Sequence, residues 1–99
     1  MLNIKTSSEN GKGVIAPEGR LDTVTAPEME KAIREILPGL TELTLDFSGL
    51  DYISSAGLRV LLSAQKAMNA QGEMKLCNVN ESVMEIFEVT GFSDILTIE

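Results

Sequence analysis

The 99-residue chain contains no histidine and no tryptophan, and only one cysteine, Cys77. Without an imidazole, a Ser-His-Asp or Cys-His nucleophile cannot be assembled, and histidine metal ligands are absent. The carboxylates are scattered rather than grouped at ligand spacing, and neither a phosphate-binding loop nor a dinucleotide fingerprint occurs. We therefore expect no enzymatic activity, no metal and no other cofactor.

Basic residues are also few. Lys and Arg total 8 against 15 Asp and Glu, so the formal net charge is −7 and binding to nucleic acid is not expected. No basic residue follows Lys75, whereas five acidic residues do. This acidic end is interpreted either as a solvated surface or as a surface that steers a basic protein partner.

Long apolar runs are missing as well. The first residues lack the apolar core of a leader peptide, and no stretch approaches the roughly 18 apolar residues of a membrane helix. The lone Cys77 cannot form an internal disulfide, which suits a reducing compartment and a place in the core. These absences predict a cytoplasmic protein without membrane insertion. The length fits one domain, residues 1–99, and a monomer is the simplest expectation.

The N-terminal part has the pattern of a hairpin. Residues 2–7 alternate apolar and polar side chains, and Asn10-Gly11 is typical of a two-residue turn. The return strand over residues 13–20 contains Pro17, which cannot donate to a ladder. Pro17 is therefore expected at a strand end, a bulge or an outward-facing edge.

Helices and strands then alternate. Thr25, Pro27 and Glu28 form a capping-box pattern that predicts a helix ending at Pro38-Gly39. The expected elements that follow are a strand over 43–47, a polar connection over 48–54, a helix over 55–69, a strand over 74–79, a helix capped by Asn80 and ended by Gly91, and a short edge strand over 95–98. This order predicts an α/β domain with a mixed sheet of four to five strands covered by three to four helices. Loops 19–25 and 48–57 are expected to meet at one end of the sheet, where ligands or partners bind.

Two segments carry a resemblance to a known family. Residues 45–62, LDFSGLDYISSAGLRVLL, closely resemble the signature of STAS domains, specifically of bacterial anti-sigma factor antagonists. Gly19-Arg20-Leu21-Asp22 is similar to the Gly-x-Leu-Asp of that family. The expected order of elements also fits the family over nearly the whole chain.

The resemblance implies a partner switch. In this family the unphosphorylated antagonist binds an anti-sigma factor that is a serine kinase, and the sigma factor is released. Phosphorylation of the antagonist reverses the switch, and a phosphatase resets it. The acceptor position falls on Ser55. The preceding position, usually aspartate, is Ser54 here, which makes Ser54 the second candidate acceptor.

The residues themselves support a surface at this point. Ser55 lies where a loop becomes a helix, so it is either a plain N-cap or an acceptor whose phosphate faces the positive end of the helix dipole. On a helical wheel Ser55, Arg59, Ser63 and Lys66 share the polar side and form one ridge. The predicted partner-binding residues are Asp22, Ser54, Ser55, Ala56, Gly57, Arg59, Leu62, Ser63 and Lys66.

Several of these residues have a simpler interpretation. Asp22 is either a cap at the start of a helix or an acid of the interface. Arg59 and Lys66 are either solvated helix positions or binding hot spots, and Leu62 is either core margin or a partner anchor. The missing side chain of Gly57 is expected to let a partner backbone approach the serine hydroxyl.

A phosphate on the serine would also meet negative charge. The carboxylates of Asp22 and Asp46 are expected to converge near it and to repel a dianion, although Asp46 is equally explained by bonds to its own loop.

Two other functions stay open at this point. One is a STAS subunit of a transport or sensory assembly that is never phosphorylated, which Ser54 in place of aspartate supports. The other is a small nucleotide-binding domain with a phosphate at the helix N-terminus.

Overall fold

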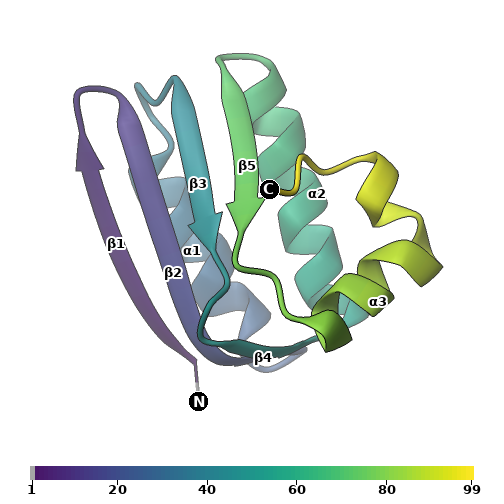
Figure 1. The fold of residues 1–99 in the computed structure, drawn as a ribbon. Coiled ribbons are helices and arrows are strands. Elements are labelled where there is room, and N and C mark those ends of the chain that lie inside the picture. The colour runs from purple at the N-terminus through teal and green to yellow at the C-terminus, as the bar shows by residue number, and fades with distance from the viewer. Residues whose placement is uncertain (1) are drawn as a thin grey trace.

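A β-hairpin opens the chain in the computed structural model, which describes residues 2–99 (Figure 1). β1 (Asn3–Glu9) and β2 (Lys12–Leu21) pair antiparallel from Asn3↔Glu18 to Glu9↔Lys12. The turn residues Asn10 and Gly11 have φ of 53° and 80°. Positive φ at both positions is what a two-residue hairpin turn requires, so the predicted hairpin is confirmed.

β2 is the strand around which the sheet is organised. Its first half pairs in parallel with β3 (Glu42–Asp46), and its end pairs in parallel with β4 (Leu50–Ile53). β5 (Glu73–Cys77) pairs in parallel with β3. The sheet therefore has five strands: β1, β2, β3 and β5 lie side by side in this order, and β4, outside this path, pairs with the end of β2. The predicted α/β class with a mixed sheet is confirmed.

One strand escaped the sequence prediction. Residues 48–54 were expected to be a polar connection, but they contain β4. In this strand Leu50 and Ile53 are buried while Asp51 and Tyr52 are exposed, so the period of two that marks a strand is absent. A register shift in the pairing with β2, between Gly19 and Arg20, accompanies this irregular pattern.

Pro17 lies inside β2, in the gap between the pairing of this strand with β3 and its pairing with β4. The pairing with β3 ends at Ile15 and the pairing with β4 begins at Gly19. The missing N–H of a proline costs least at such an interruption. Pro17 is nevertheless buried, pairs with Ile4 of β1 and precedes the register shift at Gly19, so the expectation of a strand end, a bulge or an outward-facing edge is wrong.

The described residues form three α-helices. α1 (Ala26–Ile36) and α2 (Ser55–Asn69) lie on one face of the sheet, and α3 (Glu81–Thr90) lies beside β4 (Figure 1). Asn80 caps α3 by accepting from Val83 N at 2.8 Å, and Gly91 ends it with φ of 82°, as predicted. The largest fully buried side chains, which lie between the sheet and the helices, include Ile15, Leu21, Met29, Leu43, Leu45, Phe47, Ile53, Leu61, Met68, Met74 and Phe87.

The C-terminal segment contributes a single bridge to the sheet. After a 3-10 turn, η1 (Phe92–Asp94), the expected strand over 95–98 is reduced to one bridge between Leu76 and Ile98. Leu76 donates to Thr97 O and accepts from Glu99 N, both at 2.9 Å. No helix within residues 2–99 has the length and apolar character needed to cross a membrane.

Candidate partner-binding site

The start of α2 is fixed by the end of β4. Ser54 N donates to Leu21 O at 2.9 Å, which continues the pairing of β4 with β2. Ser54 is extended, with φ of −100° and ψ of 177°, and its Oγ accepts from Gly57 N at 3.5 Å. Extended backbone and a side-chain acceptor for a first-turn N–H define an N-cap. The cap is therefore Ser54, and the expectation that Ser55 caps the helix is wrong.

Ser55 is the first residue of α2, and its side chain is exposed. Its hydroxyl forms no hydrogen bond to any other group within residues 2–99. The first turn of α2 contains no acidic residue, so its free N–H groups keep the positive end of the helix dipole uncompensated. Ser55 thus presents a free nucleophilic oxygen where added negative charge is electrostatically favoured.

Asp22 organises the loop between β2 and α1. Its Oδ1 accepts from the backbone N–H groups of Val24 at 3.0 Å and Thr25 at 3.1 Å, and the Thr25 hydroxyl oxygen lies 3.2 Å from the same atom. The bond from the Thr25 amide is the largest cause that holds the pKa of Asp22 below its ordinary value. Asp22 therefore caps the turn that leads into α1, while the N-cap position of the helix itself is Thr25, and contact of Asp22 with a partner stays a prediction.

Thr25 does not form the predicted capping box. Its hydroxyl donates to Arg20 O at 2.7 Å and accepts from Asp22 N at 2.9 Å, and it caps no N–H of α1. The hydroxyl is thus used to close the loop onto the end of β2. Because Leu21 pairs with Ile53, this closed loop lies next to Ser54 and Ser55.

The predicted ridge on α2 is present. Ser55, Arg59, Ser63 and Lys66 are all exposed, whereas Leu62 is half-buried. α2 carries these two basic residues and no acidic one, and neither forms an ion pair within residues 2–99. The ridge is therefore a positive strip on a chain whose net charge is −7.

Comparison with known proteins places this arrangement in a family. The STAS domain family matches residues 3–99 of the chain. The protein belongs to the STAS domain family.

Two curated relatives extend this finding. The Bordetella bronchiseptica protein BtrV, whose name gives a provisional assignment as an anti-sigma factor antagonist, is 36% identical over 90% of this chain and 78% of its own. The anti-sigma-B factor antagonist of Staphylococcus aureus is 26% identical over 98% of this chain and 92% of its own. Both matches include the serine segment and the Asp22 loop, because they span almost the whole chain.

Solved structures show the same fold. An anti-sigma factor antagonist from Mycobacterium paratuberculosis has a TM-score of 0.89 at 20% identity, over 99% of this chain and 85% of that one. The phosphorylated form of the Bacillus cell-fate determinant SpoIIAA has a TM-score of 0.76 at 18% identity, over 98% and 91% of the two chains.

Asp46 lies elsewhere in this STAS domain. It accepts from Asn78 Nδ2 at 3.0 Å and from Ser48 N at 3.0 Å, and the bond from Asn78 is the main cause that lowers its pKa. The neighbouring Leu45 pairs with Ile15, six residues before Leu21 on β2, which is roughly 20 Å along the strand. The expectation that Asp46 converges with Asp22 near the serine is therefore wrong.

Close packing of α2 against the sheet requires glycine at position 57. A Cβ at this position would lie 2.7 Å from Ile53 Cγ1 and 2.8 Å from Leu21 Cγ. Gly57 is buried, and its missing side chain lets the first turn of α2 approach β2 and β4. The expectation that the missing side chain makes room for a partner is wrong, since that side of the helix faces the sheet.

Sequence reasoning missed three exposed residues near the serine. Val24, at the tip of the Asp22 loop, is 82% exposed, and the Arg20 guanidinium lies 4.3 Å from the ring centroid of Tyr52. An apolar residue in a polar turn was the available signal for Val24. The Arg20–Tyr52 pair had none, because it depends on the unpredicted strand β4.

The acidic and cysteine side chains of the described residues do not meet the requirements of a metal site. Within residues 2–99, no three His, Cys, Asp or Glu side chains are grouped closely enough to hold a metal ion. The carboxylates of Asp22 and Asp46 are each occupied by amides of their own loops. The arrangement at the start of α2 instead suits covalent modification of a hydroxyl and contact with a protein.

Proposed function

We propose that this STAS domain is an anti-sigma factor antagonist. Its unphosphorylated form binds an anti-sigma factor serine kinase, so that the sigma factor is released, and phosphorylation of Ser55 by that kinase blocks binding. A phosphatase then restores the unphosphorylated form. The observation that carries the proposal is the free, exposed hydroxyl of Ser55 beside a serine that is already used as the cap. The names of both curated relatives support it.

The local geometry supports phosphorylation without unfolding. A phosphate on Ser55 Oγ would lie at the N-terminus of a 15-residue helix, where free N–H groups and the helix dipole favour anions. Ser54 would keep its bonds to Leu21 and Gly57, because the modified side chain takes part in neither. The fold would therefore tolerate the modification.

The same phosphate would oppose docking. It would add a charge of about −1.5 to −2 beside the Asp22 loop, in the middle of the proposed contact surface. A partner that covers Ser55 would then have to desolvate this charge, which costs several kcal/mol when no countercharge is supplied. The switch would thus regulate association and not folding, which is a binding role and not a catalytic one.

Matched serine variants test the acceptor. The protein is purified from its own cells under phosphatase inhibition, and its phosphorylation is mapped by intact mass and peptide analysis. We expect one phosphoryl group on Ser55, absent in Ser55→Ala and retained in Ser54→Ala. In urea unfolding, Ser54→Ala should lose about 0.5–1 kcal/mol as a removed cap, whereas Ser55→Ala should change stability by less than about 0.5 kcal/mol.

Other outcomes would point elsewhere. A phosphoryl group on Ser54 would move the acceptor by one residue. A chain that is never phosphorylated, and that is recovered in a stable transport or sensory complex, would contradict the switch and favour the unmodified subunit.

A further inference from the structure

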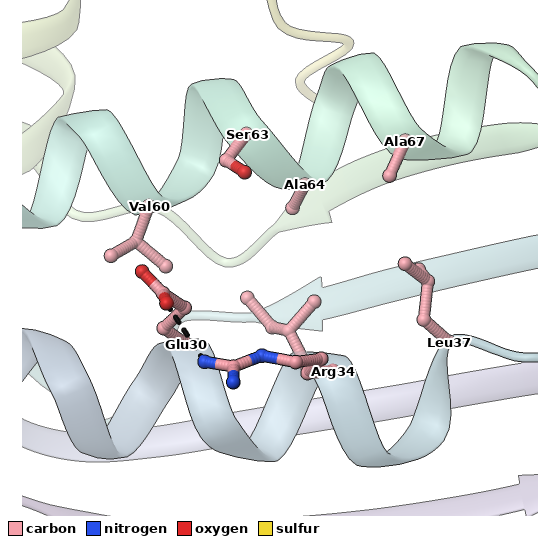
Figure 2. A pocket seen from close by; sticks show the side chains of 8 residues that line it. Glu30, Arg34, Leu37, Val60, Ser63, Ala64 and Ala67 are labelled. Atoms are coloured by element: carbon pink, nitrogen blue, oxygen red, sulfur yellow. Dashed lines mark hydrogen bonds and ion pairs between the residues drawn. The ribbon is translucent and has the colours of Figure 1, made fainter.

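A groove runs between α1 and α2 on the side of the helices away from the sheet. Its volume is about 280 Å³, and its apolar lining comprises Ile33, Leu37, Val60, Ala64 and Ala67. Figure 2 shows Val60, Ala64 and Ala67 pointing from α2 toward α1, with Leu37 pointing back toward them. The structure therefore contains an apolar slot that neither helix fills.

Charge distinguishes the rims of this groove. On the α1 rim, Glu30 is neutralised by Arg34, with Oε1 and Nη2 2.8 Å apart (Figure 2). On the α2 rim, Ser63 lines the groove, with Arg59 one turn before it and Lys66 about one turn after it. The two basic side chains are exposed and form no ion pair within residues 2–99. The lining of the groove is thus apolar with one neutralised ion pair, and the two basic side chains of the ridge lie beside it on α2.

We propose that this groove docks an apolar side chain carried by an acidic segment of the partner kinase, an inference that rests on the proposed function. The apolar floor matches an apolar side chain, and carboxylates on either side of that side chain would meet Arg59 and Lys66. Ser63 belongs both to the groove and to the ridge that begins at Ser55. The acceptor, the ridge and the groove therefore form one continuous surface.

This surface explains how phosphorylation would act at a distance from the groove. Ser55 and Arg59 are four residues apart on α2, a separation at which side chains of opposite charge pair on a helix. A phosphate on Ser55 would engage the Arg59 guanidinium in charge-assisted hydrogen bonds. It would thereby withdraw one cation from the partner and place like charge against the acidic segment.

A pair of charge reversals tests the proposal. Lys66→Glu and Lys31→Glu each make the chain two charges more negative, but Lys31 lines the opposite side of α1, next to Leu2 and Ile4 of the β1 side. Binding of the purified kinase to unphosphorylated protein is measured by titration calorimetry. We expect Lys66→Glu to weaken binding about 10-fold and Lys31→Glu less than about 2-fold. Thermal unfolding of both variants checks that each is folded.

A second variant tests the groove without changing charge. Ser63→Trp would place a large ring over the slot from an exposed position, and we expect it to weaken binding at least about 10-fold. A kinase that phosphorylates Ser55 yet binds both Lys66→Glu and Ser63→Trp as tightly as wild type would overturn the groove and leave the proposed function intact.

A probe peptide tests the groove independently of any kinase. Amide chemical shifts are followed while an amphipathic peptide of Leu and Glu is added, and then its counterpart with Lys in place of Glu. We expect the acidic peptide alone to shift resonances around Val60, Ser63 and Leu37. Equal responses to both peptides, or none to either, would overturn the inference. If the kinase fails to bind or phosphorylate the chain while the acidic peptide docks here, the proposed function fails and the groove stands.

Discussion

Gln65 is the least satisfied polar group of the core, and its replacement should stabilise the protein. It lies on the buried side of α2 between Leu61 and Met68, and only 8% of its surface is exposed. Its Nε2 donates to Asn69 Oδ1 at 2.9 Å, but its buried Oε1 has no hydrogen-bond partner within residues 2–99. A buried acceptor without a partner keeps its desolvation penalty.

The size of the effect follows from these contacts. Gln65→Leu, a change to an apolar side chain of similar size, removes a penalty of about 1–3 kcal/mol and loses about 0.5–1.5 kcal/mol for the bond to Asn69. We expect a net gain of about 1 kcal/mol in the free energy of unfolding. For a domain of this length, that gain raises Tm by about 4–8 °C.

Another glutamine provides a control of opposite sign. Gln71 Nε2 donates to Leu37 O at 2.8 Å and to Leu40 O at 2.7 Å, so Gln71→Leu loses two bonds and should destabilise by about 1–3 kcal/mol. Urea unfolding followed by circular dichroism measures both variants, with unchanged m values as the sign of a two-state comparison. A Gln65→Leu variant less stable than wild type would refute the reasoning, because it would mean that Oε1 has a partner in solution.

The remaining predictions concern the two loops at the site. Gly57→Ala should destabilise by about 1–3 kcal/mol in thermal or urea unfolding, although alanine favours helices, because its Cβ would lie 2.7 Å from Ile53 Cγ1; a gain in stability would contradict the close packing. Asp22→Asn should lower the free energy of unfolding at pH 7. The amide of Thr25 holds the pKa of Asp22 below its unfolded value of about 3.9, so the carboxylate stabilises the fold above that pH, and this contribution is lost as pH falls through the folded-state pKa. The free energies of unfolding of the two proteins should therefore converge once the pH lies below the folded-state pKa of Asp22, and a difference that persists under acidic conditions where the carboxyl is protonated would rule out the charge as its cause.

Local signals in the sequence were enough for most of the fold. Asn10-Gly11 predicted the hairpin because the turn needs positive φ at both positions, and Asn80 and Gly91 marked both ends of α3. The apolar arc over residues 55–69 predicted α2 with its observed bounds. In each of these segments, the local preference agrees with the tertiary structure.

The site was less predictable because its details depend on contacts between distant segments. Ser54 and Ser55 are equally good caps by composition, and the pairing of β4 with Leu21 decides between them. The reason for Gly57 likewise lies in two residues of the sheet that face it. At Thr25 the local sequence fits a capping box, but the hydroxyl donates instead to Arg20 O at the end of β2 and caps no N–H of α1.

The attachment of β4 to β2 has a consequence for changes in chain length. Only three residue pairs, Gly19↔Leu50, Arg20↔Tyr52 and Leu21↔Ile53, connect the end of β2 to the strand that leads into α2. A deletion of one residue in β4 would shift the register of this pairing and would move the start of α2, with Ser55, relative to the Asp22 loop. The exposed turn at Pro38-Gly39 lies outside this pairing and should accept residues added between the two carbonyls, Leu37 O and Leu40 O, that Gln71 bonds. Length variation that preserves the fold and the position of Ser55 is thus expected in exposed turns such as Pro38-Gly39, and neither in β4 nor in the Asp22 loop.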